Sequence, residues 1–146
     1  MKSLTPFIIS LLISGLEPFW PLGSPAIAVS AVLGTKYLNS RGLVAVILIG
    51  LVRDVLLVNR LGVSSAIAAF AWLLASLATS RLGRPVMVSI AAAALAGLPA
   101  IALAPAGFFP GPASYQFILS TAALAGIFSA VWNFISDRDE KIRVRK

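Results

Sequence analysis

The sequence predicts an all-α protein made of membrane-spanning helices. Hydrophobic residues make up 59% of its 146 residues, only 12% are charged, and the mean hydropathy is +0.96. Soluble domains are about 45–50% apolar and about 25% charged, so this chain lacks the polar residues that would cover a water-exposed surface. Its apolar residues fall into six runs. We therefore predict a polytopic membrane protein with one domain of six transmembrane helices over residues 1–136, followed by a basic cytoplasmic tail over residues 137–146.

Each of the six runs ends at glycine, proline, asparagine, serine or charged residues, which break helices or close spans. The runs are Thr5–Trp20, Pro25–Leu38, Gly42–Val58, Gly62–Ser80, Val86–Ala104 and Ala113–Ile135. The first two are short against the roughly 20 residues that a span needs. Each is either a short, tilted helix or half of a re-entrant hairpin.

The basic residues predict the topology. If the N-terminus is cytoplasmic and all six runs cross, every lysine and arginine except Arg53 and Arg60 falls on the cytoplasmic side. Cytoplasmic loops of membrane proteins carry an excess of these residues. We therefore expect both termini to be cytoplasmic and the protein to be a multi-pass protein of the cell inner (plasma) membrane.

The composition argues against several classes of function. The chain has no cysteine and no histidine, which excludes thiolate metal sites and disulfides and removes the commonest general base. The sequence shows no phosphate-binding glycine-rich loop and no paired nucleophile and base. We expect no catalytic residue, no cofactor and no metal. The net charge of +7 is attributed to topology and to anionic lipids at the basic tail, and not to nucleic acid.

One stretch, Gly50–Gly62, carries the most informative residues. It places two opposite charges, Arg53 and Asp54, near the outer end of the third run and then turns. A charge at the centre of a bilayer costs about 2.5–3.5 kcal/mol on insertion scales, so such residues mark candidate functional sites. The candidates for structural or partner contact are Glu17, Gly50, Arg53, Asp54, Arg60 and Gly62.

Several pairings of these charges are geometrically allowed. Glu17 lies about as far along the first run as Arg53 along the third, so Glu17 can pair with Arg53 or Arg60. Asp54 would then take the other arginine or a loop N–H. Adjacent helix positions point about 100° apart, so we expect Arg53 and Asp54 to face different neighbours. The charges either pair within the subunit and fix helix rotation, bind a partner's helix, or line a small-molecule site.

Small residues recur along the last three runs and carry two interpretations. Alanine, glycine and serine let helices approach closely in lipid. They either pack these helices within the subunit or form a docking face for a transmembrane helix of a partner.

The same stretch resembles the signature of a known family. A Gly-Leu-x-x-Asp element followed by a Leu-Gly pair occupies Gly50, Leu51, Asp54, Leu61 and Gly62. In a small six-span chain this pattern resembles that of the rod shape-determining protein MreD family.

Positions elsewhere agree with the family by pattern. They are Glu17 and Pro18 at the end of the first run, Pro25 at the start of the second, and Trp132 near the end of the sixth. Arg53 beside the aspartate is not part of the family pattern. The resemblance implies a non-enzymatic component of the cell-elongation machinery. Its implied partners are an MreC-like bitopic membrane protein and wall synthases of the RodA and penicillin-binding protein 2 type.

The resemblance also supplies an alternative function. The family is similar in fold to substrate-binding subunits of energy-coupling-factor vitamin transporters. Such a subunit needs an outward cavity with several polar or aromatic groups, whereas the predicted outer loops here are short and carry few polar residues. We therefore favour the role in cell elongation.

Overall fold

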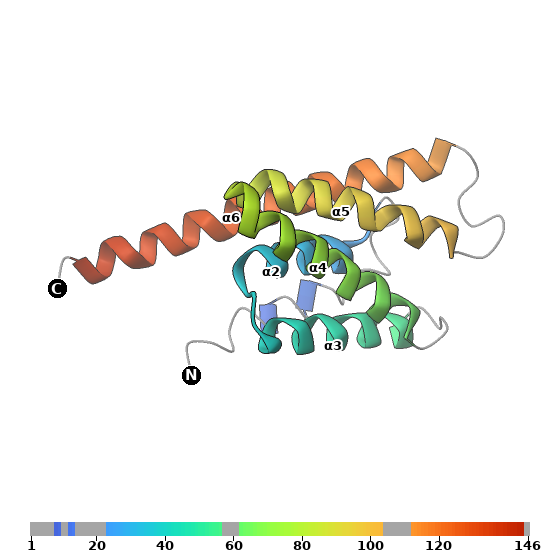
Figure 1. Cartoon of the computed structure of the whole chain (residues 1–146), viewed down its shortest axis with the longest axis horizontal. Helices are drawn as coiled ribbons and strands as arrows, with labels where there is room; N and C mark the ends of the chain where they lie inside the picture. The colour runs from blue at the N-terminus through green and yellow to red at the C-terminus, as the bar shows by residue number, and fades with distance from the viewer. Residues whose placement is uncertain (1–7, 10–11, 14–22, 57–61, 104–111, 145–146) are drawn as a thin grey trace.

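The fold is a bundle of helices. The computed structural model describes residues 8–9, 12–13, 23–56, 62–103 and 112–144, and all regular secondary structure in these ranges is helical. The prediction of an all-α fold is therefore confirmed for the described part. The long helices are α2 (Pro25–Lys36), α3 (Ser40–Leu56), α4 (Val63–Leu82), α5 (Pro85–Ala102) and α6 (Pro112–Val144) (Figure 1).

The predicted runs match these helices closely, apart from the first and the last. Most of the first run, Thr5–Trp20, lies outside the described residues. The last helix, α6, is longer than predicted and continues to Val144, so it has no break at the predicted boundary between domain and tail. The sequence that follows Ile135 contains neither glycine nor proline, and nothing there stops a helix.

Three helices in the described part are long and apolar enough to cross a membrane. They are α4, α5 and the portion Ser114–Ile135 of α6. The apolar helix α2 has only 12 residues. At 1.5 Å per residue it is about 18 Å long, which is shorter than the ~30 Å of a bilayer's hydrocarbon layer.

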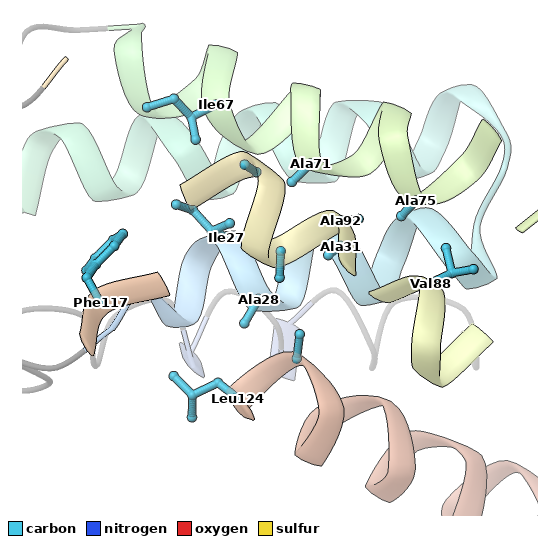
Figure 2. Close-up of a cluster of buried hydrophobic side chains, with 13 residues drawn as sticks. Ile27, Ala28, Ala31, Ile67, Ala71, Ala75, Val88, Ala92, Phe117 and Leu124 are labelled. Carbon is cyan, nitrogen blue, oxygen red and sulfur yellow. The ribbon is translucent and has the colours of Figure 1, made fainter. Parts of the chain in front are cut away.

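Helix α2 lies at the centre of the bundle. Every residue from Pro25 to Thr35 is buried, and α2 packs against α3, α4, α5 and α6. A helix that is hydrophobic all round is suited to such a position. Figure 2 shows the core cluster around it, in which side chains of α2 meet those of α4, α5 and α6. The labelled members are Ile27, Ala28, Ala31, Ile67, Ala71, Ala75, Val88, Ala92, Phe117 and Leu124.

The start of α2 is fixed by two hydroxyl groups. The Ser24 Oγ accepts a hydrogen bond from the Ile27 N–H at 3.3 Å, and Pro25 occupies the first helical position. This is the usual arrangement of an N-cap serine and an N1 proline. The Ser24 N–H donates to Thr121 Oγ1 at 3.0 Å, which attaches the start of α2 to α6.

The turn between α4 and α5 is built from local sequence signals. Gly83 has a φ of +61° and its N–H donates to the Thr79 carbonyl oxygen at 3.1 Å. Glycine is the residue that most easily takes this left-handed conformation after a helix. Pro85 then starts α5, so the connection consists of Gly83 and Arg84 alone.

The bundle has one basic end. The α2–α3 and α4–α5 connections lie at the same end of the bundle, on the left in Figure 1. That end carries Lys36, Arg41, Arg81 and Arg84. It is called the basic end below. The helical continuation of α6 also projects from it (Figure 1). These residues were predicted to share the cytoplasmic side, and the fold brings them to the same end.

Close helix approach depends on Gly34 in α2. A Cβ at this position would lie 2.4 Å from the Trp72 carbonyl oxygen and 2.8 Å from Ala75 Cβ, both in α4. Real Cβ atoms do not approach so closely, so any side chain here would push α2 and α4 apart. The contact between these two helices therefore requires glycine.

We expect Gly34→Ala to lower the free energy of unfolding by about 1–3 kcal/mol, as overpacking of a core typically does. The control is Gly97→Ala, where the new Cβ would meet only Ile118, with Cγ1 as its nearest atom at 3.3 Å and Cα at an ordinary contact distance of 3.8 Å. That variant should be as stable as the wild type or more stable, because alanine is favoured over glycine within a helix by about 0.5–1 kcal/mol. Circular dichroism during denaturant titration in detergent micelles measures both. Equal losses in the two variants would contradict the prediction.

Candidate functional site

Asp54, in the last turns of α3, binds the start of α4. Its side chain is only 1% exposed. One carboxylate oxygen, Oδ2, accepts the Gly62 N–H at 2.7 Å, and the other, Oδ1, accepts the Ser64 N–H at 3.1 Å. The first N–H groups of a helix have no partner within that helix. The carboxylate of one helix therefore caps the next, and the positive N-terminal end of α4 stabilises its negative charge.

Gly62 makes this external cap necessary. It is the N-cap residue of α4 and has a φ of +94°, a left-handed conformation that favours glycine. An N-cap serine or aspartate would supply its own acceptor to the first turn, but glycine has no side chain to do so. Asp54 provides the missing acceptor from α3.

Gly50 lies one helical turn before Asp54 on the same face of α3. A Cβ at Gly50 would lie 2.3 Å from Ser65 Cα and 2.5 Å from the Ser65 nitrogen, so glycine is required for α4 to approach. The Ser65 Oγ donates to the Ile47 carbonyl oxygen at 3.1 Å. Ile47, Gly50 and Asp54 thus form one face of α3 that contacts the first turn of α4. This set of contacts is called the α3–α4 clamp below.

Arg53 contacts the same turn of α4 as Asp54. Its guanidinium Nη1 donates to Ser64 Oγ at 2.7 Å. We expected Arg53 and Asp54 to face different neighbours, and this is wrong, because both side chains contact Ser64. The physical reason is that Ser64 offers two separate groups, its backbone N–H to the carboxylate and its hydroxyl to the long arginine side chain.

The predicted ion pairs of Glu17 cannot be followed, because Glu17 and Arg60 lie outside the described residues. Of the two alternatives for Asp54, an arginine or a loop N–H, the structure shows hydrogen bonds to N–H groups. The structure thus brings Gly50, Arg53, Asp54 and Gly62 together at one place, where α3 and α4 meet.

A second group of polar contacts joins the helices nearer the basic end. The Lys36 Nζ donates to Asn133 Oδ1, and the Trp72 Nε1–H donates to the Tyr37 carbonyl oxygen at 3.1 Å. The Tyr37 and Trp132 rings meet edge to face with centroids 6.1 Å apart.

Sequence reasoning missed this second group. It assigned no partner to Lys36, Tyr37 or Trp72. The sequence holds no signal for these contacts, because Asn133 lies 97 positions after Lys36 and Trp72 lies 35 after Tyr37.

Many of the small residues of the last three helices pack within the subunit. Many of the alanines are fully or nearly fully buried in the core clusters. They include Ala68, Ala71 and Ala75 of α4, Ala92, Ala93 and Ala96 of α5, and Ala125 of α6. These side chains are not available to a partner's helix.

The clamp offers little for direct chemistry. Both Asp54 oxygens accept backbone N–H groups, so the carboxylate is already hydrogen-bonded and buried. In the ranges that the structure describes, no three acidic, histidine or cysteine side chains gather in a way that could hold a metal ion. The arrangement is suited to fixing the geometry of two helices.

Comparison of the chain with protein-family models, with curated proteins and with solved structures finds no match.

We expect Asp54→Ala to lower the free energy of unfolding by about 2–4 kcal/mol, since each hydrogen bond to a charged group is worth about 1.5–3 kcal/mol. Asp54→Asn should fall between this variant and the wild type, because it keeps one acceptor oxygen. The control is Ser80→Ala, whose exposed hydroxyl bonds only to the Leu77 carbonyl of its own helix. Thermal unfolding in detergent measures all three. A loss in Asp54→Ala no larger than in Ser80→Ala would argue against the cap.

Gly50→Ala should separate α3 from α4, because the new Cβ meets backbone atoms of Ser65 that cannot rotate away. We expect faster hydrogen exchange at the Gly62 and Ser64 amides, since separation removes their bonds to Asp54. Gly126→Ala is the matched control, because its Cβ would meet only the flexible end of the Ile90 side chain. Unchanged exchange at both amides in Gly50→Ala would show that the approach tolerates a methyl group.

Proposed function

We propose that this protein is a non-enzymatic, integral membrane component of the machinery for cell elongation and peptidoglycan synthesis. It sits in the cell inner membrane with six spans and both termini in the cytoplasm. It binds an MreC-like bitopic membrane protein and, through the same assembly, wall synthases of the RodA and penicillin-binding protein 2 type. Its contribution is architectural, because it holds helices in a fixed arrangement that partners recognise.

The observation that carries this proposal is the coincidence of the MreD-like pattern with the α3–α4 clamp. Gly50, Asp54 and Gly62 are the pattern residues, and all three take part in the joint between α3 and α4. A catalytic or ion-carrying aspartate needs an oxygen that substrate, proton or ion can reach. Asp54 is buried and uses both oxygens on backbone N–H groups, as suits an architectural role.

The placement in a membrane has two independent supports. Three helices have the length and hydropathy of spans. In addition, Lys36, Arg41, Arg81 and Arg84 share the basic end of the bundle (Figure 1), which is the asymmetry expected when one end faces the cytoplasm.

A partner-binding role is further supported by the outer surface of α3. Several large apolar side chains along this helix are exposed in the described part of the chain, namely Val44, Leu48, Leu51 and Val55. The clamp fixes the rotation of α3 and hence the direction in which this surface points. A partner's transmembrane helix can be recognised only if that direction is constant.

The test is affinity purification of the tagged, full-length protein from its own host in mild detergent. We expect a single-span partner with a coiled coil to co-purify. We expect Asp54→Ala and Arg53→Leu to lower its recovery severalfold per folded protein, because they loosen the α3–α4 clamp. Gly34→Ala is the control, since it weakens the α2–α4 contact and leaves the clamp residues intact.

Two outcomes would contradict the proposal. One is recovery of the intact, folded protein without any such partner. The other is a bound vitamin detected by mass spectrometry in the purified protein, which would favour the substrate-binding subunit of a vitamin transporter instead.

A further inference from the structure

A groove runs along the outside of the bundle between α4 and α5. Its volume is about 650 Å³. Val88 and Ala92 belong to the core cluster and form part of its floor. Its sides are otherwise apolar and include Leu74, Ala78 and Leu82 of α4 and Met87, Ala91 and Leu95 of α5.

The groove ends at two arginines. Arg81, in the last turn of α4, and Arg84, the residue before α5, line it together. Both side chains are exposed. They come together because the turn between the helices is only Gly83 and Arg84. A site that is apolar along its length and doubly cationic at one end matches a molecule with a hydrocarbon body and an anionic head.

No acidic side chain of the described residues faces these two arginines. Asp54 is bound at the opposite end of the bundle. The acids of the tail begin at Asp137. Gly97 faces Ile118, and Gly126 faces Ile90, so α5 and α6 run antiparallel and α6 has passed the start of α5 before it reaches Asp137. Asp54 is the one acidic residue whose side chain the structure describes, so no described carboxylate lies beside the two arginines.

The length of the groove matches one leaflet of a bilayer. From Arg84 to Leu95 it follows α5 for 11 residue steps, which at 1.5 Å per residue is about 16 Å. Half of a hydrocarbon layer of ~30 Å is about 15 Å. A lipid in the leaflet at the basic end would thus place its phosphate at Arg81 and Arg84 and an acyl chain along the groove.

We propose that the α4–α5 groove is a binding site for one anionic phospholipid, with Arg81 and Arg84 holding its phosphate. Guanidinium groups bind phosphate oxygens through paired, charge-assisted hydrogen bonds. The site is separate from any lipid contact of the basic tail. It depends on the membrane insertion of α4 and α5 and not on a role in cell elongation, so the purification of partners and the lipid experiment can fail independently.

The test uses the full-length protein, delipidated in detergent and titrated with phosphatidylglycerol or phosphatidylcholine, with bound lipids counted by native mass spectrometry. We expect one phosphatidylglycerol to bind more tightly than phosphatidylcholine. In the double variant Arg81→Gln, Arg84→Gln its affinity should fall roughly thirtyfold, toward that of phosphatidylcholine, since each of the two basic residues near an anionic lipid contributes about 1 kcal/mol and about 1.4 kcal/mol is tenfold.

The matched control is Arg41→Gln, which removes an exposed arginine from the same end of the bundle but outside the groove. It should leave the affinity nearly unchanged. A second variant, Ala91→Phe, keeps both arginines and fills the groove, and it should weaken the binding of both lipids. Millimolar inorganic phosphate should not displace phosphatidylglycerol, because it lacks the acyl chain.

Four results would overturn the proposal. An equal loss in Arg41→Gln would show unspecific attraction to the basic end. An unchanged affinity of the double variant for phosphatidylglycerol would show that the two arginines do not hold the phosphate. An unchanged lipid affinity in Ala91→Phe would show that the acyl chain does not lie in the groove, which would then be free for another occupant, such as a partner's helix. Displacement by phosphate would point to a site for a soluble anion.

Discussion

The first N–H groups of a helix need an acceptor from outside that helix, because they have no partner within it. In this protein the carboxylate of Asp54 accepts two such groups at the start of α4. A buried charge is costly in isolation, but here the charge and the unsatisfied N–H groups compensate each other. Because the acceptor belongs to α3 and the donors to the start of α4, the compensation also fixes how the two helices meet.

The rest of the bundle is organised by tight packing around α2. The helix is buried on all sides and depends on small residues in its neighbours, since alanine and glycine let helices approach closely. Gly34 in α2 and Gly50 in α3 are each placed where α4 approaches too closely for a Cβ. Both glycines therefore set the position of α4, one against α2 and the other against α3.

The two ends of the bundle differ in their electrostatics. Near the α3–α4 connection, Asp54 is engaged by the backbone and by the dipole of α4. At the basic end, Arg81 and Arg84 remain exposed beside an apolar groove. The charge of Asp54 is thus balanced by groups of the protein itself, whereas the charges of Arg81 and Arg84 at the basic end can bind anions from outside. Such polarity fits a protein that has a fixed orientation in a membrane.

Several features follow from the sequence alone. The helix class, the starts of α2 and α5 at prolines, and the glycine turn after α4 are encoded within a few neighbouring residues, so local conformational preferences suffice to predict them. The sequence also singled out the stretch from Gly50 to Gly62, because a charge in an apolar run is rare and costly.

Only the tertiary structure decided what those charges do. The acceptors and donors of the clamp lie on different helices, and sequence spacing does not show that Ser64 meets both Arg53 and Asp54. The links from Ser24 to Thr121 and from Lys36 to Asn133 each join residues 97 positions apart, and contacts at that separation are set by how the helices pack.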